Sequence, residues 1–278
     1  MLTPASYPSL GQFDVASKTD DRKQLSDEQW FLIEDLFPWQ PPSEFGGRPV
    51  VPPRAVLEAL LWLLRIGGRW KDLPDGAPSE STCRRRLRKW TETGLLSEVW
   101  ARLVDLADEL GEIDWEHLIA DGTFCRAKKG GDFVGYGYKG NGTTAMVLMD
   151  GDRTPLGVLI TAANESEVNH IERLMETSVV HLPEELRLLY DGAADSDPLR
   201  ERLAAKGVEL ICAHRSNRVK PPTQDRRKLR RRRHRWKIER TNAWLQSYGR
   251  IAIRKDRLGT IFLGWVQLAC LFTILKRF

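Results

Sequence analysis

Hydrophobic side chains recur every three or four residues through the first part of the chain, the spacing that places them on one face of a helix. In "LSDEQWFLIEDLFPW" (residues 25–39) Ser26 is a suitable N-cap and Pro38 a suitable stop. The pattern predicts an amphipathic helix there. The same spacing, with glycines at the ends, predicts further helices in residues 54–67, 79–94 and 95–111.

A different pattern begins after residue 114, where short apolar runs are separated by turn residues, as is typical of strands. We expect strands in "HLIADGTF", "TTAMVLMD", "PLGVLITAAN", "LRLLYDGAAD" and "VELICAH". The turn "GDRT" joins the second and third of these into a hairpin. Helices are expected in "ESEVNHIERLMETSV" and "SDPLRERLAAKG". The order predicts an α/β fold, with a mixed five-stranded sheet flanked by helices after an all-α part.

These patterns divide the chain into three parts. Residues 1–23 are polar and aperiodic and are expected to form a flexible lead, residues 24–114 a helical domain and residues 115–278 a sheet domain with C-terminal helices.

The segment from Leu258 to Leu275 contains no charged residue and reaches the length of a membrane span. Two glycines, Gln267 and two threonines favour a buried last helix instead, and we expect no membrane association.

Composition points to a cytoplasmic protein with a polyanionic partner. The net charge is only +5, but nine of the twelve residues from 226 to 237 are Arg or Lys, and a second basic cluster lies at 84–89. Clustering of this kind suggests nucleic acid, and thus a nucleoid-associated protein. The four cysteines are scattered without CxxC spacing, so neither a zinc site nor a disulfide framework is indicated.

The first basic cluster lies on the helix predicted for residues 79–94. Helix, turn and basic helix in that order could form a helix-turn-helix that reaches a DNA groove. The alternative is a solvated cationic face, because the turn from Gly67 to Pro78 is longer than the usual three or four residues. The candidate DNA contacts on this helix are Arg84, Arg85, Arg88 and Lys89.

Two predicted strands lead to an acid, Asp121 in the first and Asp191 in the fourth. If these strands are neighbours, their carboxylates converge at one edge of the sheet. Carboxylates packed together repel one another unless a cation neutralises them, and hard oxygen ligands suit Mg²⁺ or Mn²⁺. The alternative for either residue alone is a turn former, since an acid before glycine often ends a strand.

Glu239 stands alone among cations in "RRRRHRWKIERTNAWLQSYGR" (residues 230–250) and could be a third metal ligand. A single continuous helix would place it opposite an apolar stripe. Its neighbours on that face would be Arg232, Arg235, Gln246 and Arg250, and the stripe would consist of Thr241, Trp244, Leu245 and Tyr248. The alternative is a simple ion pair of Arg235 with Glu239, worth about 0.3–0.5 kcal/mol.

Other acids have ordinary explanations. Asp195 and Ser196 are suited to capping the helix that follows them. Glu165 and Glu167 begin a predicted helix, where their charge suits the helix dipole.

With these residues in view, the chain resembles DDE transposases of bacterial insertion sequences, specifically the IS5-like group within the IS4/IS5 superfamily. The resemblance covers about residues 24–276. It rests on an ordered set of blocks: "LSDEQWFLIEDLFP", "GGRP", "LLWLLRIGGRWKDLP", "STCRRRLRKW", "ADGTFCRAKKGG", "YKGNGTTAMVLMDGDRTPL", "LYDGAADSDPLRERL" and "RWKIERTNAWLQSYGRIAIRKDR".

The resemblance implies an RNase H-like catalytic domain with Asp121, Asp191 and Glu239 as the catalytic, metal-binding triad. It implies two Mg²⁺ ions, which Mn²⁺ can replace, cleavage at the ends of the element and transfer of the freed 3′-OH to target DNA. The partners would be double-stranded DNA, as terminal inverted repeats and target site, and further copies of the chain in a homodimer or higher assembly. Phosphates would be held by Arg232, Arg235, Lys237, Arg240 and Arg250.

Three positions depart from the family's usual pattern. Arg232 stands where the family has Tyr, Gln246 stands where it has Lys, and "YDGAADSD" replaces "ADKGYDSD". Two alternatives therefore stay open. One is a Mg²⁺-dependent nuclease or a domesticated or inactive transposase relative, without strand transfer. The other is a DNA-binding regulator without enzymatic activity, for which metal would have no effect.

Overall fold

The computed structural model describes residues 25–39, 50–224 and 236–278, apart from the side chains of residues 236–239 and 241. Four α-helices precede the sheet: α1 (Asp27–Phe31), α2 (Pro53–Ile66), α3 (Glu80–Glu92) and α4 (Leu95–Glu109). The hydroxyl of Ser26 caps α1 by accepting from the backbone N–H of Gln29 at 3.1 Å. Gly67 ends α2 in the left-handed conformation, with φ 69°. The three helices predicted for residues 54–67, 79–94 and 95–111 are confirmed, whereas the first predicted helix is shorter than expected, because α1 ends at Phe31 and is followed by the 3₁₀ turn of Glu34–Leu36.

The sheet contains seven strands among the described residues. They are β1 (Leu118–Ala127), β2 (Gly135–Gly137), β3 (Gly140–Met149), β4 (Pro155–Ala162), β5 (Leu186–Leu189), β6 (Val208–Ile211) and β7 (Ile253–Arg254). The order is β2-β3-β1-β5-β6, with β4 also paired to β3 and β7 to β1. Because β1, β3 and β4 are antiparallel while β1, β5 and β6 are parallel, the sheet is mixed, as predicted.

The five predicted strands are all present. The predicted number of strands, five, was nevertheless too low. The sequence missed β2 and β7, because they span only three and two residues and are too short to give a periodic signal.

Helices lie between and after the later strands. They are η3 (Glu167–Asn169), α5 (Ile171–Glu176), η4 (Gly192–Ala194), α6 (Asp197–Ala204), α8 (Trp236–Ser247), α9 (Gly249–Ala252) and α10 (Gly259–Leu275); two further 3₁₀ turns, η1 (Glu34–Leu36) and η2 (Trp70–Asp72), belong to the N-terminal part. The helix predicted from Glu165 is therefore shorter than expected. It forms a 3₁₀ turn and then the six residues of α5.

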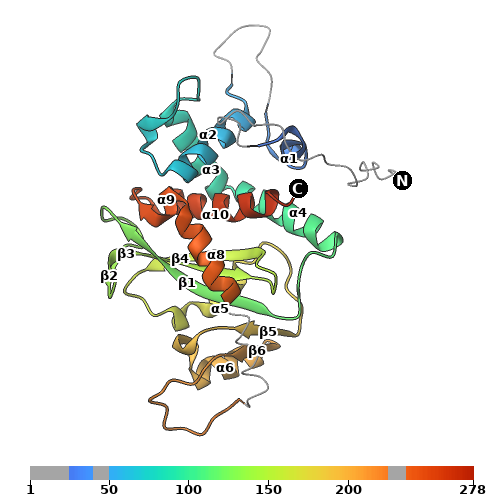
Figure 1. The fold of residues 1–278 in the computed structure, drawn as a ribbon, viewed down its shortest axis with the longest axis vertical. Coiled ribbons are helices and arrows are strands. Elements are labelled where there is room, and N and C mark those ends of the chain that lie inside the picture. Colours follow the sequence, from blue (N-terminus) through green and yellow to red (C-terminus); the bar gives the residue numbers. More distant parts are fainter. Residues whose placement is uncertain (1–24, 40–49, 225–235) are drawn as a thin grey trace.

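Figure 1 shows the layers of the molecule. The N-terminal helices lie at one end, α10 runs between them and the sheet, α8 crosses the sheet near β1, and β5, β6 and α6 form the other end. Residues from both predicted domains contribute to one continuous hydrophobic core. The boundary near residue 114 stays a prediction.

The last helix is the centre of this core. Fourteen residues of α10 are buried, including Trp265 and Phe262 at 0% exposure, so the prediction of a buried C-terminal helix is confirmed. In the described part of the chain, no helix combines the length and apolarity that a membrane crossing requires.

The segment after α8 is fixed against the N-terminal helices. A Cβ atom on Gly249 would lie 2.6 Å from the Cα of Gly67, so only glycine allows α9 to approach the end of α2 this closely. The segment that follows the helix of Glu239 is thereby packed directly against the end of α2.

Candidate metal site

Asp121 and Asp191 come from neighbouring parallel strands. β1 and β5 pair Leu118 with Leu188 and Ile119 with Leu189, so each aspartate lies two residues beyond the last pair. Their predicted convergence at one place in the sheet agrees with this register. One detail was wrong: Asp121 lies inside β1 instead of at its end, because β3 pairs with β1 from Ile119 to Arg126.

The helix α8 lies on β1 beside Asp121. Nδ2 of Asn242 donates to Oδ2 of Asp121 at 3.0 Å. One turn later, Nε2 of Gln246 donates to Oγ1 of Thr123 and to the carbonyl of Phe124, both at 2.9 Å. Glu239 precedes Asn242 by three residues in the same helix. Its side chain lies outside the described residues.

Asp191 is held by the turn that follows β5. It is the N-cap of η4, and its Oδ1 accepts from the backbone N–H of Ala193 at 2.7 Å. Arg215 fixes the outer side of the turn, because its Nη2 donates to the carbonyl of Ala193 at 2.8 Å. One oxygen of Asp191 is thus occupied by the backbone, in a side chain that is half-buried.

The side chains around Asp121 fit a divalent cation. Both aspartates supply hard carboxylate oxygens, which are the ligands that Mg²⁺ and Mn²⁺ prefer. Oδ1 of Asn242 is buried and has no hydrogen-bond partner among the described residues, although the same amide is anchored on Asp121 through Nδ2. A bound cation would satisfy this carbonyl oxygen, since a buried polar atom without a partner is costly.

Two residues of this region were not singled out as site residues by the sequence. Asn242 lies in the helix of Glu239 but carries no signal of its own, because a lone Asn in a helix is common. Glu167 was interpreted as a helix-starting acid, yet it is half-buried and accepts a hydrogen bond from Tyr190, next to Asp191. No pattern in the sequence relates these two residues to the aspartates.

The candidate DNA contacts of α3 lie on the surface. Arg84, Arg85, Arg88 and Lys89 are all exposed, whereas Cys83, Leu87 and Trp90 of the same helix are buried. Three of these arginines line a cavity of about 520 Å³ together with Trp70 and the first turn of α10. Within this group Arg88 is ion-paired to Glu92 at 2.7 Å.

The basic segment around Glu239 is described only in part. Arg240 is exposed. Arg232 and Arg235, and the side chain of Lys237, lie outside the described residues.

The prediction that Arg250 contacts a DNA phosphate is wrong. Its side chain is 1% exposed and its Nη1 contacts Oδ2 of Asp256 at 3.1 Å, so it cannot reach DNA in this structure. The phasing argument failed because α8 ends at Ser247 and Tyr248 is extended, so that Arg250 belongs to a separate helix.

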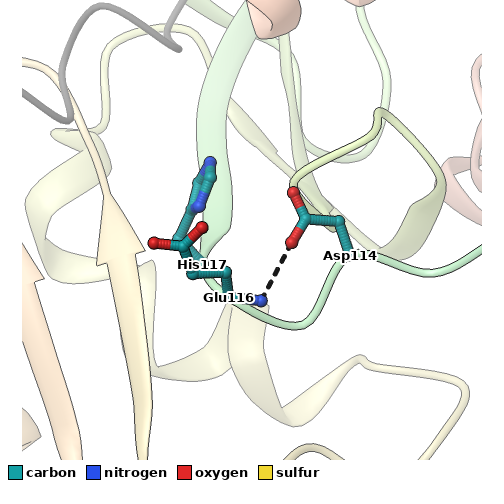
Figure 2. A group of neighbouring side chains, drawn as sticks. All are labelled: Asp114, Glu116 and His117. Carbon is teal, nitrogen blue, oxygen red and sulfur yellow. Dashed lines mark hydrogen bonds between the residues drawn. The ribbon is translucent and has the colours of Figure 1, made fainter.

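A second acidic group lies just before β1. Carboxylate oxygens of Asp114 and Glu116 and a ring nitrogen of His117 all lie within 4.8 Å of one another, a spacing that could hold a metal ion. Figure 2 shows that Asp114 accepts from the backbone N–H of Glu116, at 3.0 Å. The backbone N–H of Asp114 in turn donates to Asp150 at 2.9 Å. These hydrogen bonds also give the group a structural explanation, because they stabilise the turn that leads the chain into β1.

Comparison with known protein families gives the class of this protein. The family model described as "Transposase DDE domain" matches residues 114–274, more than half of the chain, and the chain belongs to this family. Residues 25–100 match a second model, described as "Putative transposase of IS4/5 family". The predicted family is therefore confirmed at the level of IS4/5-type DDE transposases.

Particular relatives come from insertion elements. The chain is 36% identical over 115 residues to "Insertion element IS402 uncharacterized 16.2 kDa protein" of Burkholderia cepacia, covering 40% of this chain and 78% of the relative. It is 29% identical over 136 residues to "Putative transposase for insertion sequence element IS402" of the same organism, covering 46% and 61%.

Among solved structures, a piggyBac transposase in a synaptic complex with hairpin DNA has a similar fold. The TM-score is 0.51 at 12% identity, over 84% of this chain and 68% of that chain.

Proposed function

We propose that this chain is the transposase of an IS5-like insertion sequence, which binds the terminal inverted repeats, cleaves the element ends and joins the freed 3′-OH strands to target DNA. The observation that carries the proposal is the register of β1 and β5. It brings Asp121 and Asp191 to the same level of adjacent strands, beneath the helix that contains Glu239. The catalytic part would then be an RNase H-like domain, residues 115–278.

In this proposal Asp121, Asp191 and Glu239 hold two Mg²⁺ ions. When bound, such ions lower the pKa of an attacking water and stabilise the leaving oxygen of a phosphodiester. The protein's own part is to fix the ligands: Asn242 orients the carboxylate of Asp121, and the N–H of Ala193 orients that of Asp191. Gln246 anchors α8 on β1, where the family has Lys.

DNA is proposed as the partner of both basic surfaces. Arg84, Arg85, Arg88 and Lys89 would contact phosphates from α3, in a helix-turn-helix-like domain of residues 24–114. Near the site this role would fall to Arg232, Arg235, Lys237 and Arg240. The fold similarity to a transposase solved with hairpin DNA supports such a partner. Because two element ends must be joined in one reaction, a homodimer or higher assembly on DNA is expected.

The test uses purified full-length protein and DNA that carries the inverted repeats flanking its coding frame. With Mg²⁺ we expect nicking at the repeat ends and strand-transfer products on a plasmid target. Asp191→Ala should lower cleavage by more than about 10³-fold, since the other groups cannot replace a metal ligand. Equal cleavage by wild type and Asp191→Ala would refute the assignment, and cleavage without strand transfer would identify a nuclease.

A further inference from the structure

Glu167 lies between β4 and α5, in the 3₁₀ turn η3, and its carboxylate reaches β1 next to Asp121. A Cβ atom on Gly122 would lie 2.4 Å from Oε1 and 2.5 Å from Cδ of Glu167. The carboxylate therefore occupies the space that any side chain at position 122 would need. This requirement explains the glycine in "ADGTF" more specifically than a turn does, since Gly122 is in the middle of a strand.

The other oxygen of Glu167 contacts Tyr190, the residue between the end of β5 and Asp191. The hydroxyl of Tyr190 donates to Oε2 at 2.6 Å. Tyr190 is 0% exposed, and its backbone N–H donates to the carbonyl of Ile211 on β6 at 3.0 Å. The phenol hydroxyl is the donor in this contact, because a carboxylate offers only acceptor oxygens.

Glu167 thus touches the neighbour of each candidate ligand, Gly122 beside Asp121 and Tyr190 beside Asp191. We propose that Glu167, through Tyr190, is a positioning residue that holds the two strands at the separation at which Asp121 and Asp191 bind divalent cations. The inference rests on the proposed function, because it assumes that these aspartates are metal ligands.

A positioning role fits the geometry better than direct ligation. Among the described residues, only Asp114, Glu116 and His117 form a group of three whose ligand atoms all lie within 4.8 Å. Glu167 and the two aspartates are therefore spread more widely, and Oε2 of Glu167 is already used by Tyr190. Side chains that orient metal ligands typically change metal affinity by about 10–100-fold when they are replaced.

The electrostatic environment links Glu167 to the same site. The pKa of the Glu167 carboxyl is raised above its usual value, mainly by burial and further by the charge of Asp191. The hydrogen bond from Tyr190 and the charge of Lys139 act in the opposite direction. The charges of Glu167 and Asp191 therefore act on one another, so a change at Glu167 is expected to alter the affinity of the site for a cation.

The experiment measures Mn²⁺ binding to the full-length protein, by electron paramagnetic resonance of the free ion. Glu167→Gln keeps an acceptor but loses the charge, whereas Tyr190→Phe keeps the buried ring but loses the donor. Each should weaken Mn²⁺ affinity by about 10–100-fold, and the double variant should lose little more because both act through one contact. DNA cleavage by either variant should recover at saturating Mn²⁺, which a general folding defect would not allow.

Two controls make the outcomes separable. Glu165→Gln changes a half-exposed acid in the same segment, paired to His170 at 2.7 Å, and should bind Mn²⁺ as the wild type does. Asp191→Asn should abolish binding. If Glu167→Gln and Tyr190→Phe bind normally while Asp191→Asn does not, the positioning role is wrong and the proposed function stands. If Asp191→Asn also binds normally, the proposed metal site itself is wrong. If the Glu167→Gln variant does not fold, the Mn²⁺ affinity of Tyr190→Phe alone decides whether the positioning role is correct.

Discussion

Arg250 illustrates how a basic residue from a basic segment becomes part of the core. Its guanidinium lies 4.9 Å from the ring centre of Trp70 and 5.0 Å from that of Trp265. Asp256 accepts from Arg250 and from both indole N–H groups, at 2.9 to 3.1 Å. Residues of η2, α9 and α10 therefore meet around one buried carboxylate, whose charge Arg250 balances.

Replacing Arg250 should therefore affect stability before it affects DNA binding. We expect Arg250→Ala to lower the free energy of unfolding by about 3–5 kcal/mol, because it leaves the carboxylate of Asp256 buried without its cation. Urea unfolding measures this. The exposed Arg240 on α8 provides the control, and Arg240→Ala should change stability by no more than about 0.5 kcal/mol. A similarly small effect of Arg250→Ala would contradict the structural role.

At the scale of elements, the turn after β5 depends on the loop after β6. Asp195 ends η4, and its carboxylate is 3% exposed. It accepts from the backbone N–H of Arg215 at 2.8 Å and contacts Arg200 at 2.8 Å and His214 at 3.0 Å. Arg215 in turn donates to the carbonyl of Ala193, within the turn that holds Asp191. The prediction that Asp195 and Ser196 cap the following helix is correct for Ser196, which is the N-cap of α6, and wrong for Asp195.

This arrangement predicts a pH dependence. Burial would raise the pKa of Asp195, but the hydrogen bonds from Arg215, His214 and Arg200 outweigh it and lower the pKa well below 3.8. A carboxyl with a lowered folded-state pKa stabilises the fold above its unfolded pKa and loses that contribution as the pH falls through the folded value.

We therefore expect Asp195→Asn to cost about 1–3 kcal/mol of unfolding free energy at pH 7, where hydrogen bonds to a charged group are lost. The difference from wild type should shrink as the pH falls below about 4, where the unfolded carboxyl becomes protonated. Urea unfolding between pH 7 and pH 2.5 follows this. A difference that stays constant over the range would contradict the assignment.

At the scale of the whole molecule, the proposed DNA surface on α3 is separate from the candidate metal site. The two are connected through α10, which packs against both α3 and the sheet. The α3 surface should therefore contribute to affinity for any duplex without contributing to the chemistry.

Arg84→Ala tests this separation. Loss of one phosphate contact should reduce the slope of log K against log salt concentration by about 0.9 and weaken binding to all sequences alike. Cleavage at saturating DNA should stay near the wild-type rate. Arg202→Ala is the matched control, since Arg202 is exposed on α6 and pairs with Glu172 at 2.8 Å. An unchanged salt slope for Arg84→Ala would remove α3 from the DNA surface.

Local patterns in the sequence were sufficient for most elements of the fold. Ser26 and Gly67 mark helix ends by conformational preferences that act within a few residues, and the five longer strands are apolar runs bounded by turns. The sequence also suggested that the strand of Asp121 and the strand leading to Asp191 could be neighbours, and β1 and β5 do pair in parallel; the role of the two aspartates as metal ligands stays a prediction. Arg250 was misplaced because helical phasing holds only while the helix continues, and α8 ends at Ser247.

The sequence by itself determined the longer elements and the family, since these depend on neighbouring residues or on an ordered set of motifs, and it drew attention to Asp121 and Asp191 as acids associated with two strands. Only the tertiary structure decided that these two strands are neighbours and what surrounds the two aspartates. Glu167 contacts Gly122 and Tyr190 across three separate elements, and Asn242 meets Asp121 from 121 residues away. Contacts of this kind arise from how strands and helices pack, and neither hydrophobic periodicity nor residue spacing carries information about them.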